Sequence, residues 1–340
     1  MEPYFTKTEV DKRFYLACIK ERIPARIFDV HVHINLKEHV ANVTRERIMT
    51  DWALECGIVL PCEDAYACVA ELYPDIEYRI AGFPWPIREA DLKANNEYLA
   101  QKKREGKLTP FMCTRVEWDN DYTEKVLLDG GFIGFKPYPD MVSGIKGAEI
   151  SIFDFITREQ LRILDKHKKT LLLHLPRKER LADPDNIREL LEIRQKYPDI
   201  GIIIAHLGRS FCPYHLDKGL RMMMNNVEGF YFDTSAVINT DVYKIAFEKI
   251  PLENILYGSD LPILFWHGKR EYTERQYTNL CRENYSWNKH LDSPENEGKY
   301  TLFIYEQLRA ILDAADMTGL DNKNKEAIFY DNAYRLLVRD

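Results

Sequence analysis

Eight short runs rich in β-branched and aromatic residues recur along the chain, and most are followed by longer charged stretches with helical periodicity. Helix-like segments such as "REQLRILDKHKK" and "NIRELLEIRQKYP" separate them. Runs such as "TLLLH" and "GIIIAH" are apolar without alternation, as expected of strands buried on both faces. Eight strand and helix units in one chain favour an α/β fold with a closed (β/α)8 TIM barrel over an open doubly wound sheet. The predicted strands span residues 26–34, 77–83, 108–114, 131–136, 170–175, 200–207, 229–235 and 254–260.

We expect a single barrel domain over residues 26–340, because no repeat or low-complexity linker marks a boundary. Residues 1–25 are predicted to form a helical extension that packs on the barrel. Residues 266–298, after the eighth strand, are a polar and aromatic-rich insertion. We expect this insertion to fold over the barrel mouth and contribute to specificity, or to form a subunit contact near it. The alternative is an extra helix on the outside of the barrel.

Composition excludes several classes of protein. The net charge of −7 and the pI of about 5.8 disfavour a nucleic-acid-binding surface. The chain has no apolar run of the roughly 20 residues that span a bilayer, and its first residues contain no apolar stretch of signal-peptide length. The seven cysteines are scattered and never spaced as C-x-x-C, which indicates reduced thiols. We therefore expect a cytoplasmic enzyme with no membrane or nucleic-acid partner, assembled as a homo-oligomer, most simply a dimer.

Polar residues stand where several of these strands end. Because catalytic groups of (β/α)8 enzymes lie at the carboxyl ends of the strands, these residues define the candidate site. Neutral imidazoles and a carboxylate are ligands that hold zinc or a similar divalent ion with one position open for water. The two histidines of "RIFDVHVHIN" share one face of their strand and are spaced to grip one metal. The residues are His31, His33, Lys136, His174, His206 and Asp260.

Each of these residues also has an alternative interpretation in which it stabilises the fold and takes no part in binding or catalysis. The histidines are alternatively hydrogen-bonded caps of buried strands, and Asp260 in "GSDLP" is alternatively a turn residue or helix N-cap. Lys136 is alternatively a surface lysine whose stem is buried. Arg209 is alternatively part of a surface salt bridge, although it is also placed to clamp a substrate carboxylate.

The motifs "FDVHVHI", "GFIGFKPYP", "LLLHLP", "IIIAHLG", "FDTS", "LYGSDLPI" and "AIFYDNAYRLL" together resemble the amidohydrolase superfamily, in particular its amidohydrolase 2 branch. That branch includes aminocarboxymuconate-semialdehyde decarboxylase, resorcylate decarboxylases and lactone hydrolases. The resemblance implies that His31, His33, His174 and Asp260 are metal ligands. It also implies that His206 acts as an acid/base or binds a second metal. In binuclear branches, a lysine placed like Lys136 can be carboxylated and bridge two ions.

These residues suggest a mechanism. A divalent ion, Zn²⁺ first and Mn²⁺ as the alternative, lowers the pKa of bound water toward roughly 7. Asp260 could take the proton, His206 could shuttle it, and Arg209 or Lys136 could bind the substrate. The leading prediction is a metal-dependent hydrolase that cleaves an amide, lactone or related bond in a small carboxylated substrate. The alternatives are a non-oxidative decarboxylase of an aromatic or muconate-like acid, and a non-catalytic metal-containing binding protein.

Overall fold

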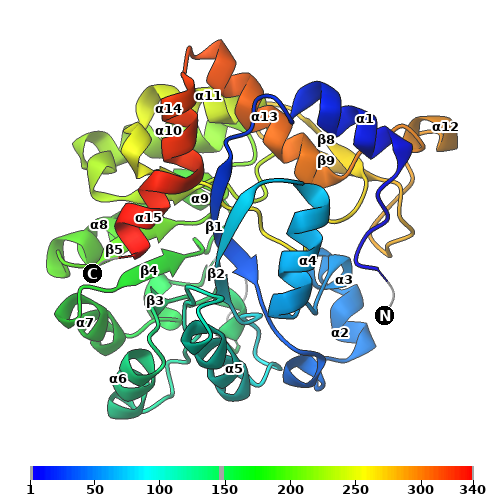
Figure 1. Cartoon of the computed structure of the whole chain (residues 1–340). Coiled ribbons are helices and arrows are strands. Elements are labelled where there is room, and N and C mark those ends of the chain that lie inside the picture. Colours follow the sequence, from blue (N-terminus) through cyan, green and yellow to red (C-terminus); the bar gives the residue numbers. More distant parts are fainter. Residues whose placement is uncertain (1–2, 145–148, 339–340) are drawn as a thin grey trace.

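The computed structural model describes residues 3–144 and 149–338 and contains a (β/α)8 barrel surrounded by helices (Figure 1). The strands are β1 (Arg26–His33), β2 (Glu77–Phe83), β3 (Gly134–Phe135), β4 (Thr170–Leu173), β5 (Gly201–Ile204), β6 (Tyr231–Asp233), β7 (Ile255–Leu256), β8 (Gly268–Tyr272) and β9 (Tyr277–Cys281). The helices are α1 (Glu9–Cys18), α2 (Arg45–Met49), α3 (Trp52–Cys56), α4 (Cys62–Leu72), α5 (Leu92–Arg104), α6 (Asn120–Asp129), α7 (Arg158–Lys166), α8 (Pro184–Lys196), α9 (His206–Arg209), α10 (Pro213–Met223), α11 (Thr240–Lys249), α12 (Pro294–Glu297), α13 (Phe303–Met317), α14 (Asn322–Glu326) and α15 (Asn332–Leu337).

The barrel closes through backbone hydrogen bonds between parallel strands. Strands β3 to β7 pair in sequence order, and β1 pairs with β2. The segment after β7 returns to β1, where the Val30 N–H donates to the Tyr257 carbonyl at 3.0 Å and the His33 N–H donates to the Leu261 carbonyl at 2.8 Å. These bonds join the last barrel segment to the first.

The third predicted strand, residues 108–114, is much less regular than expected. The Phe111 N–H donates to the Gly82 carbonyl at 2.9 Å, so this segment does link β2 to β3. Only Met112 forms a regular parallel bridge, to Phe135. Pro110 has no N–H to donate, which interrupts the ladder at this point. The prediction of a strand at Glu77–Phe83 is confirmed.

The core fills the barrel and the layer between its strands and helices. All residues of β4 and β5 are buried, as their uninterrupted apolar sequences indicate. Helix α7 places Leu161, Ile163 and Leu164 against this sheet while its charged residues face outward. None of the described helices is both long and apolar enough to cross a membrane.

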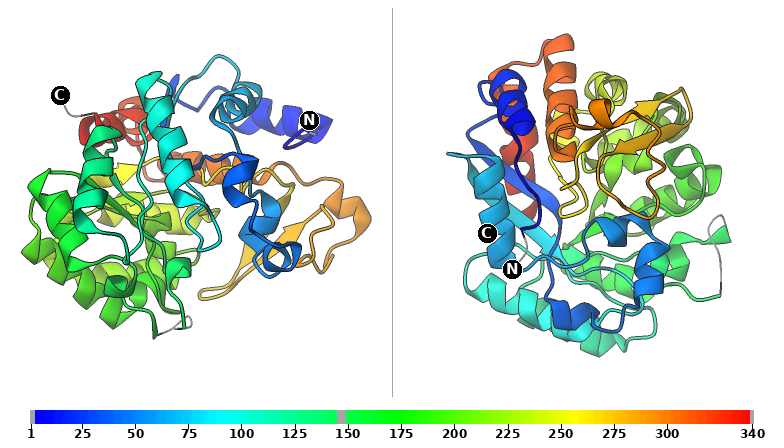
Figure 2. Two further views of the ribbon diagram at one scale, coloured as in Figure 1. Left: turned by 90° about the horizontal axis from the view of Figure 1, so that it is seen from below. Right: turned by 90° about the vertical axis from the view of Figure 1, so that its right-hand side faces the viewer.

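Residues 266–298 form an antiparallel hairpin of β8 and β9 followed by a loop and the short helix α12. This differs from the extra-helix alternative. Figure 2 shows the hairpin beside the segment that contains α2 and α3, on one side of the molecule. The Ser286 N–H donates to Glu55 at 2.8 Å, and the indole of Trp287 packs edge-on against Trp52 with ring centroids 6.2 Å apart.

Candidate metal centre

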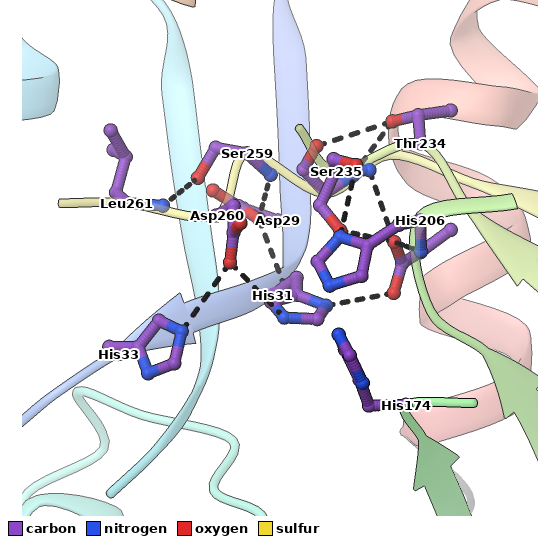
Figure 3. A network of polar contacts seen from close by, with 12 residues as sticks. Asp29, His31, His33, His174, His206, Thr234, Ser235, Ser259, Asp260 and Leu261 are labelled. Atoms are coloured by element: carbon purple, nitrogen blue, oxygen red, sulfur yellow. Dashed lines mark hydrogen bonds and ion pairs between the residues drawn. The ribbon is translucent and has the colours of Figure 1, made fainter. Parts of the chain in front are cut away.

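The ends of β1, β4, β5, β6 and β7 together form a buried polar cluster (Figure 3). His31 and His33 lie at the end of β1, and their side chains alternate with apolar Val30 and Val32. Asp233 is the last residue of β6, and His174, His206 and Asp260 follow β4, β5 and β7. Because the carboxyl ends of parallel barrel strands meet at one rim, residues far apart in sequence converge there.

The tightest part of this cluster has the geometry of a metal site. Donor atoms of His31, His206 and Asp260 all lie within 4.8 Å of one another, and the three residues are buried. The Asp260 Oδ1 atom lies 3.3 Å from the His31 Nε2 and 3.4 Å from the His33 Nε2. Tetrahedral coordination with bonds of about 2.0–2.2 Å separates neighbouring ligand atoms by about 3.3–3.6 Å. The donor atoms of His31, His206 and Asp260 therefore fit around a single divalent ion.

Hydrogen bonds orient two of the imidazoles so that Nε2 is free. The Nδ1 atom of His31 donates to the Asp233 carboxylate at 2.9 Å. The Nδ1 atom of His206 lies 3.1 Å from the Ser235 carbonyl, which can only accept, so the proton is on Nδ1. In both rings the lone pair therefore stays on Nε2. A carboxylate or carbonyl behind a histidine is the arrangement that fixes metal-binding imidazoles in other proteins.

His33 and His174 carry further buried nitrogens. The Nδ1 atoms of both rings lack a hydrogen-bond partner among the residues that the structure describes. The His174 Nε2 lies 3.3 Å from the Tyr138 hydroxyl, and its ring meets His206 edge-on with centroids 5.3 Å apart. Unsatisfied buried nitrogens are costly, which is consistent with a cluster that binds a ligand.

The protonation states are those that metal binding requires. Burial, only partly opposed by the Asp260 carboxylate, lowers the pKa values of both His33 and His206 to about 4. Burial also lowers the pKa of His174 well below its usual range. Although burial disfavours the charged form of Asp260, the surrounding imidazoles, His206 foremost, hold its pKa well below its usual value. At neutral pH His33, His174 and His206 are therefore neutral imidazoles, and Asp260 is a carboxylate.

The backbone is strained where the cluster is assembled. His206, Leu207 and Arg209 have φ values of 57°, 49° and 60°, so α9 is a left-handed turn. Asp260 also has a positive φ, of 71°. Such conformations cost about 1–2 kcal/mol per non-glycine residue and persist only where the surrounding structure imposes them. Here they point His206 and Asp260 toward β1.

Sequence reasoning did not select Asp233 as a site residue. The carboxylate is fully buried, accepts from the His31 ring, and also accepts from the His206 N–H at 2.8 Å. Burial raises its pKa, but His31 and the neighbouring donors outweigh that effect and hold the pKa well below its usual value. The signal was available, because Asp233 stands at a strand end within the quoted motif "FDTS".

Lys136, the residue that follows β3, is completely buried. Its ammonium nitrogen lies 5.1 Å from the centre of the Phe83 ring and 5.2 Å from that of Tyr138, and it lacks a hydrogen-bond partner among the described residues. Burial lowers the pKa of Lys136 to about 8, against the opposing effect of Asp233 and Asp260. The surface-lysine alternative is therefore wrong.

The cluster opens into a cavity of about 380 Å³. Five aromatic side chains line it, as do the basic residues Arg177, Lys178 and Arg209 and the acidic residues Asp51 and Asp140. The guanidinium of Arg209 donates to the Leu175 carbonyl at 3.0 Å and has no carboxylate within 4.0 Å in the described part of the chain. The surface salt bridge considered for Arg209 is therefore absent there. The aromatic residues are Trp52, Trp85, Tyr138, Phe211 and Tyr277.

The β8–β9 hairpin contributes directly to this cavity. Tyr277, at the start of β9, lines it and meets the Phe211 ring edge-on with centroids 5.2 Å apart. The guanidinium of Arg270 on β8 lies 4.5 Å from the centre of the Tyr277 ring and 5.0 Å from that of Phe211. Part of the insertion therefore forms a wall at the barrel mouth.

Comparison with known structures supports the fold over nearly the whole chain. A 5-carboxyvanillate decarboxylase from Novosphingobium aromaticivorans, crystallised with manganese, is 12% identical with a TM-score of 0.57, covering 92% of this chain and 97% of its own. A 2,6-dihydroxybenzoate decarboxylase is 15% identical with a TM-score of 0.51, covering 93% and 100%. A probable 2-pyrone-4,6-dicarboxylic acid hydrolase from Acinetobacter baumannii is 14% identical with a TM-score of 0.53, covering 92% and 99%.

Comparison with curated protein sequences gave no match. The sequence profile of the amidohydrolase family, in its amidohydrolase 2 form, matches residues 49–339. This range contains four of the barrel strands that carry the polar cluster, with His174, His206, Asp233 and Asp260. The chain is therefore a member of the amidohydrolase 2 family.

Proposed function

We propose that this protein is a metal-dependent, non-oxidative decarboxylase that acts on a small aromatic carboxylic acid. The observation that carries this proposal is the cavity above the His and Asp cluster. Aromatic rings line it, and the Arg209 guanidinium beside it has no carboxylate partner among the described residues. A flat ring with an anionic substituent complements such a cavity in shape, stacking and charge.

The metal would be held by His31, His33, His174 and Asp260, and His206 would stay free to move a proton. When bound, a divalent ion supplies Lewis acidity toward an oxygen of the substrate or water. Zinc suits the nitrogen-rich donor set. Manganese is the alternative, since two of the similar decarboxylases were crystallised with it.

In this proposal the protein's own residues orient the acid and move one proton. Arg209 binds an anionic oxygen of the substrate, and Trp85, Phe211 and Tyr277 confine the ring and exclude water. The bond between the ring carbon and the carboxylate breaks, and carbon dioxide leaves. The electron pair of the broken bond stays on the ring carbon. The ring carbon then takes a proton that is relayed through Asp260 and the Nε2 of His206. The reaction consumes no water.

Hydrolysis, our leading prediction from the sequence, becomes the second candidate. The same cluster suits activation of water, and the similar structures include a probable 2-pyrone-4,6-dicarboxylic acid hydrolase. Most of the named similar enzymes are decarboxylases, which favours the alternative.

One experiment separates these functions. The metal-loaded protein is incubated in D₂O or in H₂¹⁸O with hydroxylated benzoates and with aryl lactones, and products are analysed by mass spectrometry. Decarboxylation gives one carbon dioxide per substrate and one deuterium at the vacated ring carbon. Incorporation of ¹⁸O without carbon dioxide would establish hydrolysis instead. Tight binding of these acids without any turnover would favour a binding protein.

The His206→Asn variant tests the proton relay in the same assay. We expect turnover to fall by about 10²-fold or more, which is the usual contribution of a general acid or base. The control is His215→Asn, a buried histidine of α10 that is absent from the cavity lining. Unchanged turnover in His206→Asn, with the metal content equal to that of the wild type, would exclude the relay.

A further inference from the structure

A second hollow, of about 460 Å³, lies at the opposite end of the barrel from the metal centre. Thr170 lines it at the beginning of β4, whereas His174 follows the end of the same strand. Thr109 and Ile133, which precede the barrel segments at Met112 and β3, also line it. We call this feature the basal hollow. It shares no lining residue with the cavity above the metal centre.

The basal hollow is lined by cationic side chains from several elements. Arg79 comes from β2, Lys103 from α5, and Lys168 and Lys169 from the turn before β4. No aspartate or glutamate lines the hollow in the described part of the chain. The chain as a whole has a net charge of −7, so this local excess of positive charge opposes its average.

These cations lack carboxylate partners among the residues that the structure describes. Within the described ranges, none of Arg79, Lys103, Lys168 and Lys169 lies within 4.0 Å of a carboxylate oxygen. By contrast Lys102, adjacent to Lys103 on α5, lies 2.7 Å from Glu63. His167 is the exception in the lining, because its ring lies 2.5 Å from Glu124.

The positive charges that line the basal hollow repel one another when no anion lies between them. Lys169 is half-buried, and among the described residues its ammonium group donates only to the Phe132 carbonyl, at 2.9 Å. Burial first, and then the positive charge of Lys103, lower the pKa of Lys169. Arg79 packs over the Phe28 and Tyr334 rings, each at 5.4 Å, which holds its guanidinium in place. An anion placed between these groups would relieve their repulsion.

The rest of the lining indicates the size and character of the ligand. Thr109 and Thr170 are polar, and α15 and the following residue contribute apolar Leu336, Leu337 and Val338. A volume of about 460 Å³ exceeds what one inorganic anion needs and leaves room for a small organic group. We propose that the basal hollow is a binding site for a small phosphate-bearing anion, separate from the metal centre.

The test uses Lys103→Gln/Lys168→Gln, since neither ammonium group makes a hydrogen bond or ion pair with the described residues and the fold should survive their loss. Binding of inorganic phosphate and of phenyl phosphate to the metal-loaded protein is measured by calorimetry at low, constant ionic strength. We expect one additional phosphate site in the wild type and at least about a tenfold weaker affinity in the double variant.

The matched control is Lys12→Gln/Lys299→Gln, which removes two exposed lysines far from the basal hollow along the chain and should leave the affinity unchanged. Tighter binding of phenyl phosphate than of phosphate would assign the apolar lining to a phosphate ester, and equal binding would assign the site to free phosphate. Lys169→Gln provides an independent variant in the same lining. Equal affinities in the wild type and the Lys103→Gln/Lys168→Gln variant, or no binding of either probe, would overturn the proposal.

Discussion

The imidazole of His31 shows how much of this site depends on a single residue behind it. Asp233 accepts the Nδ1 proton of His31 and also the backbone N–H of His206, so one buried carboxylate orients two cluster residues. Metal-binding histidines depend on such partners for ring orientation and basicity. Asp233 is therefore a positioning residue in the proposed site.

We predict that Asp233→Asn keeps the fold but weakens metal affinity by about 10- to 100-fold, because the amide is a poorer acceptor for the His31 ring. Competition with a chromogenic chelator measures this affinity. Asp241→Asn, on the exposed start of α11, is the control and should bind like the wild type. Equal affinity in all three proteins would contradict the role of Asp233.

Substitution of the two histidines at the end of β1 tests metal binding directly. His31→Ala/His33→Ala should abolish stoichiometric metal, because it removes both nitrogens that meet the Asp260 Oδ1. Inductively coupled plasma mass spectrometry of dialysed protein gives the metal content per chain. His167→Ala/His290→Ala removes two histidines outside the cavity lining and should retain the metal. Retention of a full metal complement by the first variant would exclude these ligands.

At the scale of elements, the β8–β9 hairpin supports the site as well as lining it. The Arg270 guanidinium is buried and donates to the Ala236 carbonyl at 2.9 Å. Ala236 follows Ser235, whose hydroxyl and carbonyl both contact the His206 Nδ1. The insertion thus contacts the loop that orients His206, and this contact lies between β8 and the end of β6.

Arg270→Met should lower both stability and turnover, because it leaves the Ala236 carbonyl without its donor while preserving most of the buried volume. The loss of a buried hydrogen bond to a charged donor costs about 1–3 kcal/mol. Arg275→Met, in the exposed turn of the same hairpin, is the matched control. Urea unfolding and steady-state kinetics measure the two effects. If Arg270→Met retained wild-type turnover, the proposed support of His206 by the hairpin would be wrong.

Helix α1 is attached to the barrel through a buried polar group. His267 lies 3.0 Å from Asp11 and 2.6 Å from Glu283. Burial disfavours the charged imidazole, but hydrogen bonds to both carboxylates outweigh it and raise the pKa of His267. Burial likewise opposes ionisation of Asp11 and Glu283, but hydrogen bonds from His267 lower the pKa of each.

These shifts predict a pH window for stability. The contribution of His267 is complete below its unfolded pKa of about 6.5 and is lost as pH rises through its higher folded pKa. The carboxylates contribute above their unfolded pKa values of about 4 and lose this contribution as pH falls through the folded ones. The free-energy difference between wild type and His267→Gln, from urea unfolding, should therefore be largest near pH 5–6 and smaller at pH 8.5. His290→Gln, exposed on the insertion, is the control. A difference that grows toward pH 8.5 would contradict this assignment.

At the scale of the whole molecule, the barrel depends on close approach between β3 and β4. A Cβ atom on Gly134 would lie 1.7 Å from the Thr170 carbonyl oxygen, so these strands could not keep their register. The polar cluster is assembled only when the ring is closed, because the segment after β7 that carries Asp260 hydrogen-bonds to β1. A change that separates β3 from β4 should therefore affect stability and metal binding together.

We predict that Gly134→Ala is destabilised by more than about 3 kcal/mol, beyond the usual cost of overpacking, or fails to fold. Gly298→Ala is the control, since its added Cβ would meet other atoms no closer than 3.4 Å and should change stability by less than about 0.5 kcal/mol. Thermal and urea unfolding measure both. A Gly134→Ala protein as stable as the control would contradict this prediction. It would show that β3 and β4 can accommodate a Cβ atom at residue 134 without losing their pairing.

The sequence by itself determined the barrel and most of the polar strand ends. Strands buried on both faces require uninterrupted apolar runs, so β4 and β5 are visible in "TLLL" and "GIII", and the residues that follow them are visible as candidates. The sequence pattern predicts a regular third strand at residues 108–114, which the structure does not have. Pro110 has no N–H and cannot donate one of the hydrogen bonds to the neighbouring strand, and a strand pattern alone does not reveal this loss.

Only the tertiary structure decided how those candidates meet. Asp233 and His31 are separated by 202 residues, and Asp260 meets His31 only because the barrel closes. The hairpin wall, the buried environment of Lys136 and the cations of the basal hollow likewise depend on contacts between distant segments. Local sequence specifies backbone conformation and burial pattern, whereas orientation, protonation state and the pairing of charges are set by neighbours that only the closed fold brings together.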